Sequence, residues 1–128
     1  MELRPETAAL KRILDAMPGA VSEPMTPRRG ARPLVLIYKL MGKTFAILGL
    51  REDPHVILKC DPHLAEVLRE EYAGVGHRSH LDRRHWIAVT LDADVPAGEI
   101  ERLAAQSYDL VRAGLTRKQA AELAARTS

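Results

Sequence analysis

Two stretches in the first 72 residues carry hydrophobic residues at helical spacing. Between Thr7 and Met17 the apolar positions recur about every 3.6 residues, so they form one stripe on a helix that Pro18-Gly19 ends. The second stretch follows Asp61-Pro62, where the aspartate can cap free backbone amides and the proline suits the first helical turn. The pattern predicts one helix near the N-terminus and a second in the middle of the chain.

The C-terminal part repeats the helical pattern. Residues 98–113 have apolar positions at helical spacing, and Gly114 stands where a helix commonly ends in a left-handed residue. Thr116 and Gln119 then form a capping pattern in which each side chain can bond to the other residue's backbone amide. We expect a third helix, followed by a short fourth helix that runs to about residue 125.

Short segments rich in β-branched and aromatic residues lie between these helices. Turns of only a few residues separate them, which is typical of adjacent antiparallel strands. The stretch from Pro18 to Pro33 contains repeated prolines, which lack the amide that a sheet requires, so it is predicted as a loop with at most a short extended edge piece. The predicted strands are residues 34–40, 44–50, 55–60 and 86–91, with a further short strand within 73–80.

The order of these elements predicts the fold class. Strands joined by such short turns cannot run parallel, and helices stand at both ends of the chain. A length of 128 residues and a hydrophobic content of 46% suit one modest core. We therefore predict a single domain over residues 1–128 of the α+β class, with helices packed on an antiparallel sheet in two layers.

Composition and charge disfavour several classes of protein. Nineteen Lys and Arg against 17 Asp and Glu give a net charge of only +2, so nucleic-acid binding would require clustered cations. The single cysteine cannot form an internal disulfide, and no apolar run approaches the roughly 18 residues of a membrane-spanning helix. The first five residues lack the apolar core of a signal peptide. We expect a cytoplasmic protein without membrane association.

Positive charge is concentrated in a few places. Residues 76–86 hold three arginines and three histidines against the single carboxylate of Asp82. A second group of arginines lies in the proline-rich stretch, and Lys39 and Lys43 lie on or beside the first hairpin. If these segments converge, they form a surface that can neutralise several phosphates and release counterions. The alternative is that they are solvated loops whose charges pair with the acidic helices.

The histidines and the cysteine are the residues best suited to chemistry. His77, His80 and His85 lack the spacing of a common zinc site, and the neighbouring arginines would repel a divalent cation. His80 and His85 are therefore interpreted as residues whose hydrogen bonds hold an irregular loop. Cys60 stands at the start of a helix, where a thiol pKa can fall, but a cysteine that ends an apolar strand is typically a core residue. We predict no catalytic residue, no metal and no cofactor.

Several short motifs recur in one known family. They are Pro18–Ala20, Gly42–Ala46, Leu58–Pro62, His80–Trp86 and Ser107–Val111. In order and spacing they resemble the MmcQ/YjbR family of small bacterial proteins, and the resemblance extends from about residue 9 to 118. The family's histidine motif usually reads H-x-N-K-x-H-W, whereas this chain has Asp82 and Arg83 at the Asn and Lys positions.

The resemblance implies a two-layer α+β domain and the description of a DNA-binding protein, with no catalytic residue and no cofactor. We therefore predict a protein without enzymatic activity whose partner is double-stranded DNA, bound through phosphates without strong base readout. The residues expected to make the contacts are Arg28, Arg29, Arg32, Lys43, His80, Arg83, Arg84 and His85. The alternative is a small-molecule or protein-binding module with a pocket lined by the histidines of residues 77–85.

Overall fold

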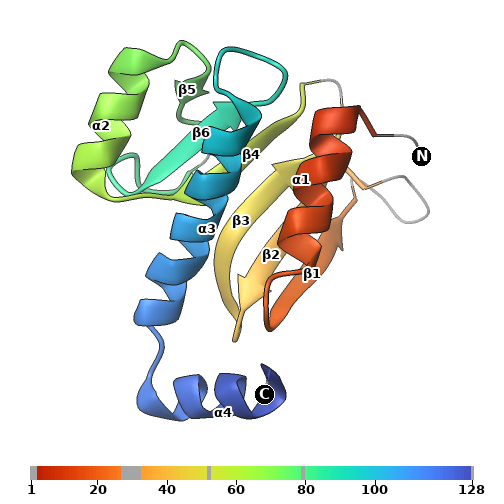
Figure 1. Cartoon of the computed structure of the whole chain (residues 1–128), viewed down its shortest axis with the longest axis vertical. Helices are drawn as coiled ribbons and strands as arrows, with labels where there is room; N and C mark the ends of the chain where they lie inside the picture. Colours follow the sequence, from red (N-terminus) through yellow and green to blue (C-terminus); the bar gives the residue numbers. More distant parts are fainter. Residues whose placement is uncertain (1–2, 27–32, 52, 79, 128) are drawn as a thin grey trace.

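The computed structural model describes residues 3–26, 33–51, 53–78 and 80–127, and these contain one antiparallel sheet of six strands. The strands are β1 (Ala20–Met25), β2 (Val35–Leu40), β3 (Lys43–Gly49), β4 (His55–Lys59), β5 (Val75–Gly76) and β6 (Trp86–Thr90), in the sheet order β1-β2-β3-β4-β6-β5 (Figure 1). The described helices are α1 (Pro5–Asp15), α2 (Pro62–Glu71), α3 (Ala97–Ala113) and α4 (Arg117–Thr127). The predicted α+β class is confirmed. Within the described ranges no helix is long and apolar enough to cross a membrane.

The β2–β3 hairpin illustrates how the sequence sets the register. Leu40 pairs with Lys43, so only Met41 and Gly42 connect the two strands. Both connecting residues have positive φ angles, 51° and 84°, because a two-residue turn must follow the twist of its strands. Glycine adopts such an angle without strain. The hairpin predicted for residues 34–50 is confirmed.

The proline-rich segment differs from its prediction. Residues 20–25 form a full edge strand that pairs with β2 from Ala20↔Leu40 to Met25↔Val35, rather than a loop. Pro24 lies within this strand and is tolerated because one side of an edge strand has no ladder partner. Pro24 therefore does not prevent the pairing of residues 20–25.

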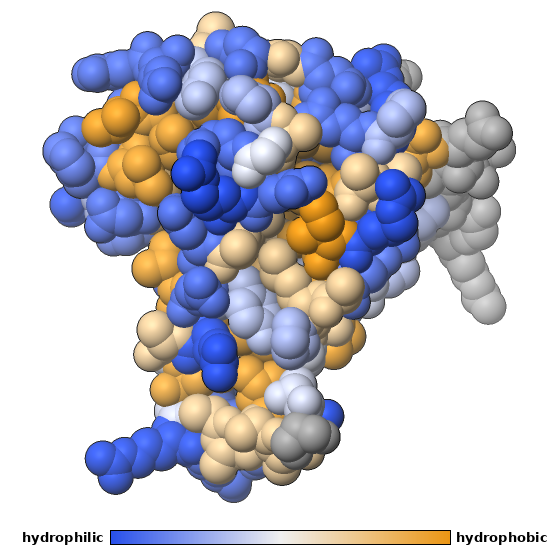
Figure 2. Space-filling view, in the orientation of Figure 1, coloured by the Kyte–Doolittle hydropathy of each residue, from blue (hydrophilic) through white to orange (hydrophobic). Residues whose placement is uncertain are grey.

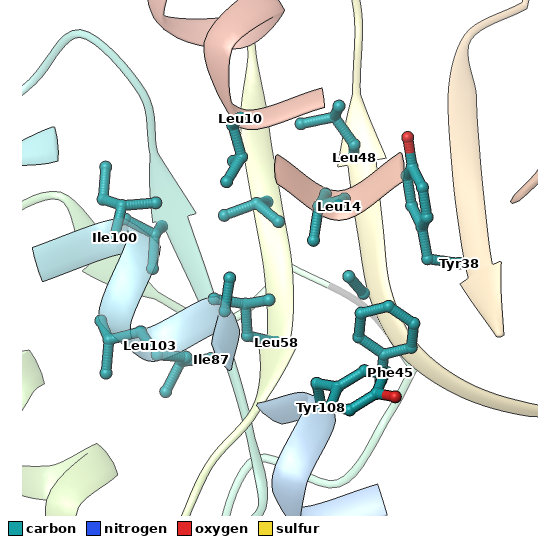
Figure 3. Packing of buried hydrophobic residues seen from close by; sticks show 14 of the residues in the cluster. Leu10, Leu14, Tyr38, Phe45, Leu48, Leu58, Ile87, Ile100, Leu103 and Tyr108 are labelled. Atoms are coloured by element: carbon teal, nitrogen blue, oxygen red, sulfur yellow. The ribbon is translucent and has the colours of Figure 1, made fainter. Parts of the chain in front are cut away.

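α1 and α3 lie against one face of the sheet, and the core fills the space between these two layers (Figure 1). Phe45 is fully buried, and its ring is perpendicular to that of Tyr108 at a centroid distance of 5.4 Å. The Tyr38 ring lies 6.1 Å from Phe45. Figure 3 shows Leu14 of α1 and Ile100 of α3 in the same cluster. The predicted two-layer arrangement is therefore present.

A buried hydroxyl connects the helix layer to the sheet at a point where two strands separate. The regular β3–β4 pairing ends at Ala46↔Leu58. One residue further, Ser107 of α3 accepts a hydrogen bond from the Lys59 amide at 2.8 Å and donates one to the Phe45 carbonyl at 2.5 Å. The serine hydroxyl thus satisfies the Lys59 amide and the Phe45 carbonyl, two backbone groups beyond the last regular pair of β3 and β4.

α4 begins with the capping pattern predicted from the sequence. The Gln119 amide donates to the Thr116 hydroxyl at 3.1 Å, and the Thr116 amide donates to the Gln119 side chain at 3.0 Å. Leu123 is the buried residue of this helix, and it packs so closely on Gly19 that a side chain at that glycine would collide with it. The helix is therefore docked on the α1–β1 turn and leaves most of its other positions exposed.

Candidate functional site

Residues 82–85 form a tight turn that leads into β6. The His85 amide donates to the Asp82 carbonyl at 3.1 Å, and the Asp82 carboxylate accepts the Arg84 amide at 2.9 Å. The same carboxylate contacts the His85 ring, and this hydrogen bond is the main reason that the pKa of Asp82 lies below its usual range. Arg83 and Arg84 therefore occupy the two central positions of a turn whose conformation Asp82 fixes.

The histidines of this segment differ in their roles. His85 holds the turn as the sequence analysis expects, through its contact with Asp82. A ring nitrogen of His77 also bonds to the Leu81 carbonyl oxygen at 2.5 Å, whereas His80 is exposed and the described residues offer its side chain no hydrogen bond. The part of the chain that the structure describes contains no group of three or more histidine, cysteine, aspartate or glutamate side chains placed to hold a metal ion.

Arg69 of α2 connects the turn to that helix. Its guanidinium donates to the carbonyl of Arg83 at 2.6 Å and to the carbonyl of Trp86 at 2.9 Å. From the end of β4, the Cys60 amide donates to the His85 carbonyl at 2.7 Å. Burial lowers the pKa of the Arg69 guanidinium, and the nearby charge of Arg83 lowers it further. The turn is therefore fixed between α2 and the end of β4.

A hollow of about 330 Å³ lies between α2 and this turn, and we call it the α2 hollow. Its lining residues are Pro62, Glu66, Arg69, Glu70, Arg83 and Arg84. Two of the predicted phosphate-binding arginines therefore share their surroundings with two glutamates, whose charges repel a polyanion. The alternative prediction placed histidines around a pocket, but the α2 hollow is lined by the arginines of the same segment.

Cations from three segments gather at the other end of the molecule. The Lys43 ammonium donates to the Gly114 carbonyl at 3.0 Å, and the Arg126 guanidinium lies 3.7 Å from the Met41 sulfur. These contacts bring the β2–β3 turn against the α3–α4 connection and the C-terminal end of α4. The resulting basic end consists of five exposed cations: Lys43, Arg112, Arg117, Lys118 and Arg126. Figure 2 shows hydrophilic side chains projecting from this end of the protein.

The basic end carries little negative charge. Residues 41–43 and 112–127 contain these five cations and one carboxylate, that of Glu122. Among the described residues, no ion pair involves any of the five cations. Their charges are therefore available to a ligand in solution.

The structure keeps Lys43 apart from Arg83 and Arg84. In Figure 1 the β2–β3 turn lies at the end of the sheet that faces α4, whereas β6 begins beside α2. The remaining predicted arginines lie outside the described residues: Arg28, Arg29 and Arg32. The described members of the predicted basic surface therefore fall into two separate groups, and only the positions of the three arginines outside the described residues stay a prediction.

The sequence prediction omits four of the five residues of the basic end. It used residues 116–119 only as a helix-capping pattern. The signal that could have found them is the charge of each element, since residues 112–127 hold four cations and one carboxylate. That these cations meet Lys43 follows only from the way in which α4 docks.

Cys60 is expected to be an unreactive thiol. It is buried, and burial together with the nearby charge of Asp61 raises its pKa to about 11. At pH 8 about one thiol in a thousand is then ionised, compared with a substantial fraction of an exposed thiol. We expect iodoacetamide to alkylate Cys60 about a hundredfold more slowly than glutathione at this pH, and faster as the pH rises. Mass spectrometry measures both rates, with the urea-unfolded protein as control; a rate equal to that of glutathione would contradict the buried thiol.

Comparison with known proteins identifies the family of this chain. The YjbR family model matches residues 15–110, which is most of the chain. The chain belongs to the YjbR family. Among its members, the Escherichia coli K12 protein named Uncharacterized protein YjbR is 42% identical over 55 residues, which cover 43% of this chain and 47% of that protein. Bacillus subtilis YyaQ is 33% identical over 78 residues, which cover 60% of this chain and 64% of that protein. The match thus spans about half the length of the E. coli relative.

Solved structures extend the YjbR comparison to the fold. The crystal structure of Deinococcus radiodurans DR2400, a DUF419 domain, is 30% identical with a TM-score of 0.76, and the match covers 91% of this chain and 86% of that one. A crystal structure from Pseudomonas syringae is 25% identical with a TM-score of 0.57, covering 70% and 86% of the two chains. The YjbR model includes the turn at residues 82–85, but it ends before four cations of the basic end.

Proposed function

We propose that the protein binds the phosphate backbone of double-stranded DNA through the basic end, without catalysing a reaction. The observation that carries this proposal is the meeting of the β2–β3 turn with the α3–α4 connection and α4, segments that hold five exposed cations and one carboxylate. Cations placed against phosphates release condensed counterions, which is the main source of affinity that does not depend on base sequence.

Several contacts fix the position of α4 and so keep its cations together on one surface. Its first turn is closed by the reciprocal bonds of Thr116 and Gln119, and Leu123 anchors the helix on Gly19. Lys43 is positioned by its bond to the Gly114 carbonyl and keeps further ammonium protons for a phosphate. Contacts of this kind position a protein on DNA without reading its sequence, so we expect weak sequence preference.

The double substitution Arg117→Gln/Lys118→Gln is expected to weaken DNA binding and its dependence on salt. Each phosphate contact contributes about 0.9 to the slope of log affinity against log salt concentration, so the slope should decrease by about two. Fluorescence anisotropy of a labelled duplex, titrated at several salt concentrations between about 50 and 200 mM, measures this slope.

The matched control is Arg83→Gln/Arg84→Gln, which removes the same charge beside the glutamates of the α2 hollow. We expect its salt slope to equal that of the unchanged protein. Equal losses in the two variants would show that the basic end is not the contact surface. Absence of binding by the unchanged protein at about 50 mM salt would remove the proposal altogether.

A further inference from the structure

The α2 hollow is a second charged site that the DNA-binding proposal does not use. Its volume of about 330 Å³ falls in the range of pockets that take small ligands. Its lining residues belong to α2 and to the turn at residues 82–85, whereas the basic end lies at α4, and Figure 1 shows α2 and α4 far apart. A ligand of the hollow would therefore not compete with DNA held at the basic end.

Opposite charges form two different walls of the hollow. Glu66 and Glu70 stand four residues apart on α2 and so share one face of that helix, while Arg83 and Arg84 come from the turn. All four side chains are exposed. Within the described part of the chain, no hydrogen bond or ion pair joins either glutamate to any of the arginines that line the hollow. The α2 side of the hollow therefore carries two carboxylates and the Arg69 guanidinium, which feels the charge of Glu66, and the turn side carries two guanidiniums.

The turn wall is rigid before any ligand binds. Arg69 uses its guanidinium to bond the carbonyls of Arg83 and Trp86, which ties the turn to α2. Asp82 accepts the Arg84 amide and fixes the turn from within. These bonds fix the backbone of the turn relative to α2, so binding has to order only the exposed side chains that line the hollow.

We propose that the α2 hollow binds a small zwitterionic molecule, with its carboxylate or phosphate group toward Arg83 and Arg84 and its ammonium group toward Glu66 and Glu70. A simple anion is opposed by the glutamate wall, and a simple cation is opposed by the guanidiniums. A molecule that carries both charges a few bonds apart is attracted by both walls. Guanidiniums suit the oxyanion because they can donate two parallel hydrogen bonds to it.

Matched probes test this proposal by nuclear magnetic resonance with nitrogen-15 labelled protein. β-Alanine carries a carboxylate and an ammonium, and propionate and propylamine each carry one half of that charge pattern. O-Phosphoethanolamine and inorganic phosphate form a second set, which shows whether the oxyanion is a carboxylate or a phosphate. We expect a zwitterion to shift the amides of residues 62–70 and 82–86 saturably, with a dissociation constant about two- to fivefold below that of either half.

Charge-neutral variants distinguish the two walls. Glu66→Gln/Glu70→Gln should abolish the preference for the zwitterion over the simple anion, and Arg83→Gln/Arg84→Gln should weaken binding of both. Glu122→Gln at the basic end is the matched control for loss of a carboxylate, and it should leave every probe unaffected. All these side chains are exposed, so the variants are expected to fold.

Two results would overturn the proposal. One is equal affinity for zwitterion and simple anion, and the other is the absence of saturable shifts with all the probes. Because the Arg117→Gln/Lys118→Gln variant is expected to retain zwitterion binding, failure at the hollow and failure of DNA binding are separate outcomes.

Discussion

Replacement of Phe45 by alanine is expected to lower the free energy of unfolding by about 3–5 kcal/mol. The side chain has no exposed surface and lies between the two layers, so its removal leaves a cavity that rigid neighbours cannot fill. The edge-to-face contact with Tyr108, at 5.4 Å between ring centroids, is lost as well. Urea denaturation followed by circular dichroism measures the change as a shift of the midpoint.

The control for this variant is Val21→Ala on the edge strand β1. Val21 is 57% exposed, so its truncation should change the free energy of unfolding by less than about 0.5 kcal/mol. A loss below about 1 kcal/mol for Phe45→Ala would mean that the ring is not part of a close-packed core.

Ser107→Ala is expected to lower the free energy of unfolding by about 2–3 kcal/mol, although it removes a single oxygen atom. The Ser107 hydroxyl bonds to the Lys59 amide and to the Phe45 carbonyl, and both backbone groups lose their partner in the variant. An unsatisfied buried backbone group costs more than the net value of the hydrogen bond that it made.

Ser22→Ala, at an exposed position of β1, removes the same atom where water can replace it. We expect no measurable change for this control in the same urea titration. If the two serine variants are equally stable, the Ser107 hydroxyl does not make the bonds to the backbone of β3 and β4 that are described above.

Local sequence patterns were sufficient to predict most of the helices and strands. The Asp61 cap accepts the amides of His63 and Leu64 as expected, and the reciprocal cap of α4 forms at Thr116 and Gln119. These features depend on residues close together in the sequence, so the rules of helix ends apply directly. The prediction for residues 18–33 allowed only a short extended edge piece, whereas Ala20–Met25 pair along their full length, because Pro24 is tolerated at the edge of the sheet.

The candidate site depended on contacts between distant segments, and these could not be predicted from the pattern. Arg83 and Arg84 were recognised as clustered cations, but their position beside Glu66 and Glu70 follows from the bonds of Arg69 to the turn. The charges in α2 were visible in the sequence, whereas the distance between the two segments was not.

The basic end likewise depends on contacts that could not be predicted from the sequence. Lys43 was predicted as a phosphate contact, yet its neighbours on α4 were not, because 71 residues separate it from Gly114. The buried contact of Leu123 with Gly19 decides where α4 docks, and no local rule predicts this contact. Charge counted by element would have indicated the basic helix but not its partner.

The most direct measurement is a map of the DNA-binding surface by nitrogen-15 nuclear magnetic resonance, with a short duplex added to the 128-residue chain at low salt. We predict that the amide shifts concentrate in residues 41–43 and 112–127, that they decrease as salt is raised, and that residues 82–86 do not respond. Shifts centred on residues 82–86, or no shifts at any DNA concentration, would contradict binding through the basic end.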